Sequence, residues 1–133
     1  MNDNDTSNIE EEKPVSNSKT YKEYYENGQL KREKPTVNGK KHGTLKEYYK
    51  TGELRSEILY VDGEKHGICK GYYETGQLEY ECSYVNDKLH DIYKEYYTNG
   101  KLKEESRYDC GKLIGTNNYD ENGNIIIKKC LFN

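Results

Sequence analysis

Hydrophobic and polar residues alternate along this chain in short runs that are bounded by turn residues. Within residues 43–66, two runs rich in β-branched and aromatic residues are separated by Thr51-Gly52 and followed by Asp62-Gly63. Asn-Gly occupies four further turns, at 27–28, 38–39, 99–100 and 122–123, and Asn-Gly between alternating runs is the strongest short-range hairpin signal. Neither run has the length or the period of about 3.6 residues of an amphipathic helix. The pattern predicts an all-β chain, a single-layer antiparallel β-meander of about ten strands.

The hairpin unit recurs with a period of 24 residues through four full copies. Turn glycines, leucines, tyrosine pairs and histidines all follow this period; the second tyrosines of the pairs are Tyr25, Tyr49, Tyr73 and Tyr97, and the histidines are His42, His66 and His90. A fifth, degenerate copy contains Gly115 and Tyr119, and we expect one residue to be lost between them. Repeats of this kind predict an open ribbon in which each hairpin is stabilised by its neighbours.

The register of the hairpins can be tested against the charges of opposed residues. A two-residue turn at Thr51-Gly52 places Lys46 opposite Glu57, and the same rule pairs a lysine with a glutamate in every full copy. The other pairs are Lys22 with Glu33, Lys70 with Glu81, and Lys94 with Glu105. Threonine is a poor residue for a turn that needs positive φ, so a three-residue loop with a glycine bulge stays open as an alternative.

Two columns of the predicted sheet change together in the third copy, which supports the same register. Cys69 would face Cys82, and Gly71 would face Tyr80, where an aromatic ring compensates for a glycine in a strand. The two cysteines could form a cross-strand disulfide in this register, but we expect two free thiols in a reducing cytosol.

A four-residue second loop at 62–65 stacks the copies without stagger and sorts their residues onto two faces. One face would carry the alternating Lys and Glu row, and the other would carry tyrosines paired with leucines, such as Tyr49 with Leu54. Because a one-layer sheet has no second layer to cover it, this aromatic face is the candidate partner-binding surface. Its residues are Tyr49, Leu54, Ile58, Tyr60, Tyr73, Leu78, Tyr80, Tyr84, Tyr97 and Leu102. The alternative is a self-sufficient ribbon in which Lys, Arg and Glu stems shield the tyrosines.

Three short motifs of the repeat resemble those of a known family. They are Gly-x-x-His-Gly at 39–43 and 63–67, Tyr-Tyr-x-x-Gly-x-Leu, and Tyr-x-x-Gly at 60–63. Over residues 20 to 128 the chain resembles MORN repeat proteins, and more closely the variant MORN repeat of bacterial YwqK-type proteins, which are often labelled antitoxin-like. The resemblance implies a single-layer antiparallel sheet that acts in protein association and, in some members, in contact with membrane lipid. It also implies an antitoxin-like sequestration of a partner as one form of that association.

Composition and charge narrow the choice of partner. The chain has 133 residues, of which 34% are charged and 32% hydrophobic, which is too polar for a deep aliphatic core. Residues 1–19 hold five acids and two lysines and are predicted to be a disordered acidic tail. The remaining repeat domain, 20–133, is formally neutral, which disfavours nucleic acid and membrane lipid as partners. Without an apolar run long enough to span a bilayer or a signal-like segment, we expect a cytoplasmic protein.

The residues that could carry chemistry do not form a recognisable site. Equivalent histidines lie two strands apart, about 9.6 Å, which is too far for one ion, so we expect a loop-packing role and no metal. The cysteines are Cys69, Cys82, Cys110 and Cys130, and none has Cys-x-x-Cys spacing. No nucleophile elbow or phosphate loop is present, and the repeated glutamates have lysine partners, so we expect neither an enzyme nor a cofactor.

These observations predict a non-enzymatic repeat scaffold that binds another protein or a second copy of the chain. The alternative of a different class is carbohydrate recognition on the tyrosine-rich face, because the Tyr-Tyr-x-x-x-Gly rhythm is also similar to bacterial cell-wall-binding repeats. The absence of Trp counts against that alternative. A membrane-associated adaptor is a third option.

Overall fold

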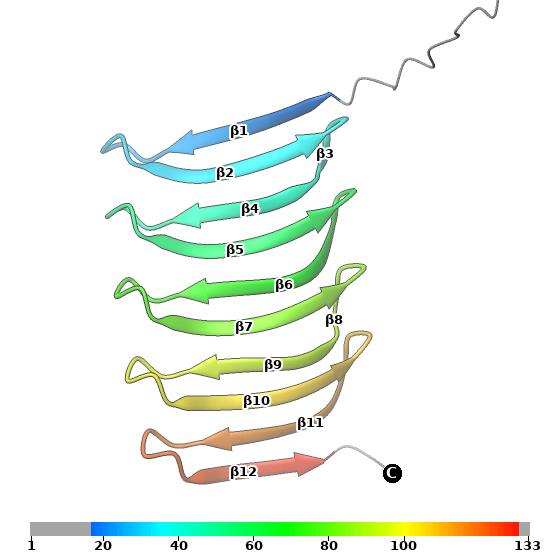
Figure 1. Cartoon of the computed structure of the whole chain (residues 1–133). Coiled ribbons are helices and arrows are strands. Elements are labelled where there is room, and N and C mark those ends of the chain that lie inside the picture. The colour runs from blue at the N-terminus through cyan, green and yellow to red at the C-terminus, as the bar shows by residue number, and fades with distance from the viewer. Residues whose placement is uncertain (1–16, 131–133) are drawn as a thin grey trace, which may run out of the picture.

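The computed structural model describes residues 17–130, which form one open antiparallel sheet (Figure 1). Ten strands follow one another across the sheet in chain order: β1 (Ser18–Tyr24), β2 (Leu30–Val37), β4 (Gly43–Tyr48), β5 (Leu54–Val61), β6 (Glu64–Tyr72), β7 (Leu78–Val85), β9 (Asp91–Tyr96), β10 (Leu102–Asp109), β11 (Lys112–Tyr119) and β12 (Ile125–Cys130). Two further strands of two residues, β3 (Lys40–Lys41) and β8 (Lys88–Leu89), pair with β2 and β7. The predicted meander is confirmed.

The sheet begins slightly earlier than predicted. Lys19 pairs with Thr36 in β1 and β2, although residue 19 was assigned to the acidic tail. Residues 1–16, the rest of the predicted disordered tail, and residues 131–133 lie outside the described part of the chain.

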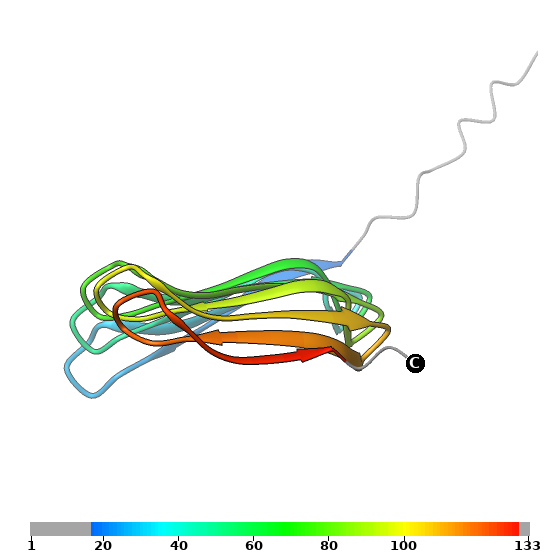
Figure 2. The ribbon, with the colours of Figure 1, turned by 90° about the horizontal axis from the view of Figure 1, so that it is seen from below.

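Residues 17–130 form a sheet that is one layer thick and gently curved, and none of these residues packs as a second layer on either face (Figure 2). Its buried apolar side chains are few: Leu45, Tyr60, Cys69 and Cys82. Stability therefore comes from contacts between neighbouring strands rather than from a deep core. The described residues include no helix of a length and apolarity that could cross a membrane.

The loop between β4 and β5 is the three-residue alternative. The N–H of Gly52 donates to the carbonyl of Tyr49 at 2.9 Å, and the N–H of Tyr49 donates to the carbonyl of Glu53 at 2.8 Å. Gly52 has φ of 95°, whereas Thr51 avoids positive φ. This is a type I turn closed by a glycine bulge, so the predicted two-residue turn is wrong.

A second bulge beside this loop changes which residues face each other. Lys46 lies opposite Glu57 as predicted, but the register then shifts, and Leu54 lies opposite Tyr48 rather than Tyr49. Opposed residues share a face, and Tyr48 shares a face with Lys46, two residues away. Leu54 therefore lies on the Lys–Glu face, which corrects the predicted pairing of leucine with the second tyrosine.

The loop between β5 and β6 has two residues instead of the predicted four. Asp62 and Gly63 have φ of 49° and 88°, as a type I′ turn requires, and Val61 pairs with Glu64. The two surplus residues are absorbed as a bulge in β6, where Gly67 has φ of 85°. Beyond the bulge, the predicted register returns.

The centre of the sheet matches the predicted register closely. Glu57 lies opposite Lys70, and Lys70 lies opposite Glu81, so the Lys and Glu row is continuous there. Cys69 lies opposite Cys82, and Gly71 lies opposite Tyr80. The remaining lysine–glutamate pairs, 22 with 33 and 94 with 105, are also formed.

The fifth copy lost its residue at a different place from the one predicted. In β11 the register passes from Leu113 opposite Tyr108 to Gly115 opposite Arg107, so only Ile114 is surplus. The equivalent bulge in β6 has two surplus residues. The deletion therefore lies in the bulge before Gly115, and not between Gly115 and Tyr119.

Candidate functional site

One face of the sheet, here called the tyrosine face, carries Leu45, Ile58, Tyr60, Cys69, Tyr80, Cys82 and Tyr84. Three tyrosines of this face have a glycine opposite: Gly43 with Tyr60, Gly67 with Tyr84, and Gly71 with Tyr80. A Cβ on Gly71 would overlap the Tyr80 ring, so this ring lies directly over the backbone of the neighbouring strand. The structure thus brings together four of the ten predicted site residues: Ile58, Tyr60, Tyr80 and Tyr84.

The tyrosines of this face are partly withdrawn from water but keep their protons. Tyr60 is only 8% exposed, and Tyr80 and Tyr84 are half-buried. Burial raises the pKa of Tyr84 to about 12 and also raises the pKa of Tyr60 and Tyr80. At neutral pH all three hydroxyls are therefore neutral hydrogen-bond donors.

A second set, here called the edge tyrosines, holds successive hairpins together. It consists of Tyr25, Tyr49, Tyr73 and Tyr97, and each hydroxyl donates to a backbone carbonyl of the next hairpin, those of Tyr48, Tyr72, Tyr96 and Tyr119, at 2.6, 2.6, 2.6 and 2.7 Å. The Arg55 guanidinium lies 5.6 Å from the Tyr49 ring centre, and the Lys103 ammonium lies 5.6 Å from that of Tyr97. The predicted site residues Tyr49, Tyr73 and Tyr97 are thus engaged within the ribbon, as the shielding alternative expects.

The three leucines of the predicted site lie elsewhere. Leu54, Leu78 and Leu102 are opposite Tyr48, Tyr72 and Tyr96 on the Lys–Glu face. On that face the Tyr72 hydroxyl donates to Glu57 at 3.1 Å. The predicted surface is therefore divided between two faces by the bulges.

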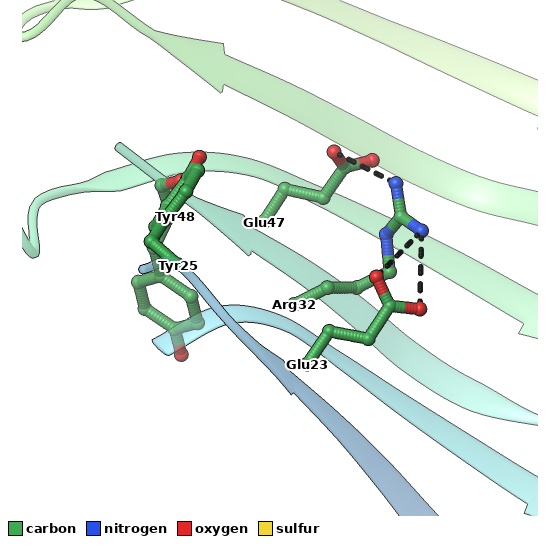
Figure 3. Close-up of polar contacts among 5 residues, drawn as sticks. All are labelled: Glu23, Tyr25, Arg32, Glu47 and Tyr48. Carbon is green, nitrogen blue, oxygen red and sulfur yellow. Dashed lines mark hydrogen bonds and ion pairs between the residues drawn. The ribbon is translucent and has the colours of Figure 1, made fainter. Parts of the chain in front are cut away.

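The N-terminal end of the tyrosine face is bordered by charge. Arg32 reaches between Glu23 and Glu47, with nitrogen–oxygen distances of 3.4 and 3.5 Å (Figure 3). Glu47 follows Leu45 by two residues, which places it on the tyrosine face. The face thus combines an aromatic centre with a charged border.

Cys69 and Cys82 are free thiols buried at the centre of the tyrosine face, 2% and 4% exposed. The hydrogen bond between them lowers the pKa of Cys69, while the same bond and burial raise the pKa of Cys82. The predicted opposition is present, with two thiols in place of a disulfide.

Two histidines contact the turn of the following hairpin. The Nδ1 atom of His42 accepts a hydrogen bond from the N–H of Asp62 at 3.3 Å, and that of His90 accepts one from the N–H of Cys110 at 3.2 Å. This confirms the predicted loop-packing role for these two residues. At His90 the contact also brings in Asp109 and Cys110, a group that was missed because its members come from different copies.

Comparison with known protein families supports the repeat found in the sequence. The profile of the MORN repeat variant family matches residues 19–38, 41–62, 65–86 and 92–109, more than half of the chain. None of the curated proteins compared with the chain matches its sequence.

The solved structures that are similar to the chain include two of TarM. The crystal structure of TarM has 16% identity and a TM-score of 0.43, over 86% of this chain and 20% of that one. An S. aureus TarM mutant in complex with Fondaparinux, alpha-GlcNAc-glycerol and UDP has 15% identity and a TM-score of 0.45, over 84% and 20%. The chain spans one fifth of the length of these proteins. By its four matched segments, each of which follows the hairpin period, the chain belongs to the MORN repeat variant family.

Proposed function

We propose that the chain is a non-catalytic repeat module that binds a partner protein through Ile58, Tyr60, Tyr80 and Tyr84 of the tyrosine face. The observation that supports this most directly is the hydrogen bonding of the tyrosine hydroxyls. Those of the edge tyrosines donate to backbone carbonyls, whereas those of Tyr60, Tyr80 and Tyr84 have no hydrogen-bond partner among residues 17–130. No side-chain oxygen in that range is both buried and unpaired, so these hydroxyls reach solvent and are available to a partner.

The chemistry of the face suits a protein surface. Protein interfaces are rich in tyrosine at their centres and have polar borders, and a tyrosine supplies a large contact area at a low cost in conformational entropy. Here Tyr80 is held over Gly71, and the Arg32 cluster forms part of the border. A partner with an apolar patch and hydrogen-bond acceptors would match both features.

The family is consistent with this role. MORN repeats are generally modules that bind proteins or membranes. Because residues 20–133 carry no formal net charge, attraction to an anionic membrane surface is weak, which favours a protein partner. Sequestration of a toxic partner, the antitoxin-like role, is a special form of this function that rests on the resemblance alone.

Capture of a partner from lysate of the native host tests the proposal. The Tyr80→Ala, Tyr84→Ala double variant should lose the captured protein, because interface tyrosines contribute about 2 kcal/mol each, together a loss of roughly 1,000-fold in affinity. The matched control is Ile68→Ala, since Ile68 is 58% exposed but lies on the Lys–Glu face, and it should capture normally.

Circular dichroism should confirm that both variants keep their β-structure. Equal capture by the double variant and the parent chain would contradict the proposed face. Binding to a glycan array without any captured protein would instead favour the carbohydrate alternative.

A further inference from the structure

The turn between β10 and β11 brings three metal-binding residue types together. The Nδ1 atom of His90 lies 3.8 Å from the Cys110 sulfur and 3.8 Å from the Asp109 carboxylate. All three ligand atoms lie within 4.8 Å of one another. His90 comes from the preceding hairpin, and its N–H donates to the carbonyl of Ser83 at 2.9 Å, which fixes the backbone that presents the imidazole.

The other copies show that this turn is unusual. At the place of Cys110 they have Asn38, Asp62 and Asn86, and at the place of Asp109 they have Val37, Val61 and Val85. Both positions change in the same turn, and both changes introduce a residue type that can bind a metal ion.

The backbone conformation at Cys110 is unusual for a cysteine. Cys110 has φ of 44°, in the left-handed region that asparagine and aspartate adopt more readily than cysteine. The thiol is therefore present at a position where local preference opposes it, and strain of this kind is found where a side chain serves a function.

The turn between β5 and β6, at Asp62-Gly63, provides an internal comparison. His42 makes the same contact with the next turn, and its Nδ1 atom lies 3.4 Å from the Asp62 carboxylate. That turn has Gly63 after Asp62 and Val61 before it, so no thiol is available. The fold thus places a histidine beside both turns, and of the two only the β10–β11 turn has both a thiol and a carboxylate.

We propose that His90, Asp109 and Cys110 bind a zinc ion, with a water molecule in the fourth position. Imidazole, thiolate and carboxylate are the ligands that Zn²⁺ takes in proteins. A tetrahedral Zn²⁺ with bonds of about 2.3 Å to sulfur and 2.0 Å to nitrogen holds these two atoms about 3.5 Å apart, close to the observed separation. Binding replaces the hydrogen bond from the Cys110 N–H to His90 and ties the connection between β8 and β9 to the β10–β11 turn.

The test uses the full chain with Zn²⁺ alone and with Co²⁺ as a spectroscopic probe. We expect one Zn²⁺ per chain by calorimetry and a thiolate-to-Co²⁺ charge-transfer band in the near ultraviolet. Cys110→Asn restores the residue type of the earlier copies, so it should fold normally, lose the band and weaken Zn²⁺ binding about 100-fold or more. His90→Ala should weaken binding in the same way.

Two control variants distinguish this site from adventitious binding. His42→Ala removes the equivalent histidine of an earlier copy, and Cys130→Ser removes the other exposed thiol; both should keep the band and the stoichiometry. A band that persists in Cys110→Asn, or Zn²⁺ binding that is equal in all variants, would overturn the proposal. Absence of any band in the parent chain would do the same.

Discussion

The edge tyrosines and the tyrosines of the tyrosine face are the same residue type in two different situations. The hydroxyl of Tyr73 donates to a carbonyl of the next hairpin, whereas Tyr80 lies over Gly71 and its hydroxyl has no partner among the described residues. The edge set joins hairpins in every full copy, whereas Tyr60, Tyr80 and Tyr84 come from β5 and β7. A count of tyrosines therefore says little about a binding surface until the hydrogen-bond partner of each hydroxyl is known.

The largest effect is expected where a face tyrosine meets its glycine. Gly71→Ala places a Cβ where the Tyr80 ring lies, so the ring must leave its position over Gly71, and we expect a loss of about 2 kcal/mol in the free energy of unfolding. Urea denaturation measures this change.

The matched control is Gly115→Ala, because neither Gly115 nor Gly71 has positive φ, and a Cβ there meets only the Lys129 carbonyl at an ordinary 3.5 Å. Equal destabilisation by both variants would mean that the Tyr80–Gly71 contact has no special role.

Removal of single hydroxyls tests the comparison directly. Tyr73→Phe leaves the Tyr96 carbonyl without its donor and should cost about 1 kcal/mol, whereas Tyr80→Phe removes a hydroxyl that donates to nothing in the ribbon and should be close to neutral. Thermal unfolding of the two variants should therefore separate them. If Tyr80→Phe destabilises the chain as much as Tyr73→Phe, the face hydroxyls are structural.

High pH should produce a smaller effect on the tyrosine face. Because burial holds the pKa of Tyr84 in the folded chain near 12, above the ordinary 10.0, the folded state retains this proton more strongly than the unfolded state. The resulting stabilisation is complete below pH 10 and is lost as the pH rises from about 10 to about 12. Tyr84→Phe should flatten the fall of the unfolding free energy across this window; an unchanged slope would show that Tyr84 is not the group responsible.

The strands and the central register could be predicted from the sequence because opposed residues in neighbouring strands have complementary side chains. Lys46 with Glu57, Cys69 with Cys82 and Gly71 with Tyr80 could be paired from residue types alone, and the structure confirms these pairs. The positions of the bulges could not be predicted in this way, since an extra residue alters the spacing without requiring a particular side chain. This is why the leucine of each copy was assigned to the wrong face.

The candidate site could be predicted only in part, also because the bulges were not foreseen. Tyr60, Tyr80 and Tyr84 were found because they lie beyond the bulges, where simple alternation holds. The group around His90 was not found, because a register drawn with a four-residue loop keeps His90 away from the next turn. The joint departure of Asp109 and Cys110 from the repeat was the signal that could have revealed it.

The acceptor of each edge tyrosine hydroxyl is a backbone carbonyl rather than a side chain. Every residue type has that carbonyl, so the hydrogen bond that joins two hairpins does not depend on which residue accepts it. Copies of the unit can therefore diverge, be duplicated or be exchanged while the joint stays the same. The ribbon is in this sense a modular support on which one copy can acquire a glycine with its tyrosine, and another a cysteine, independently of the rest.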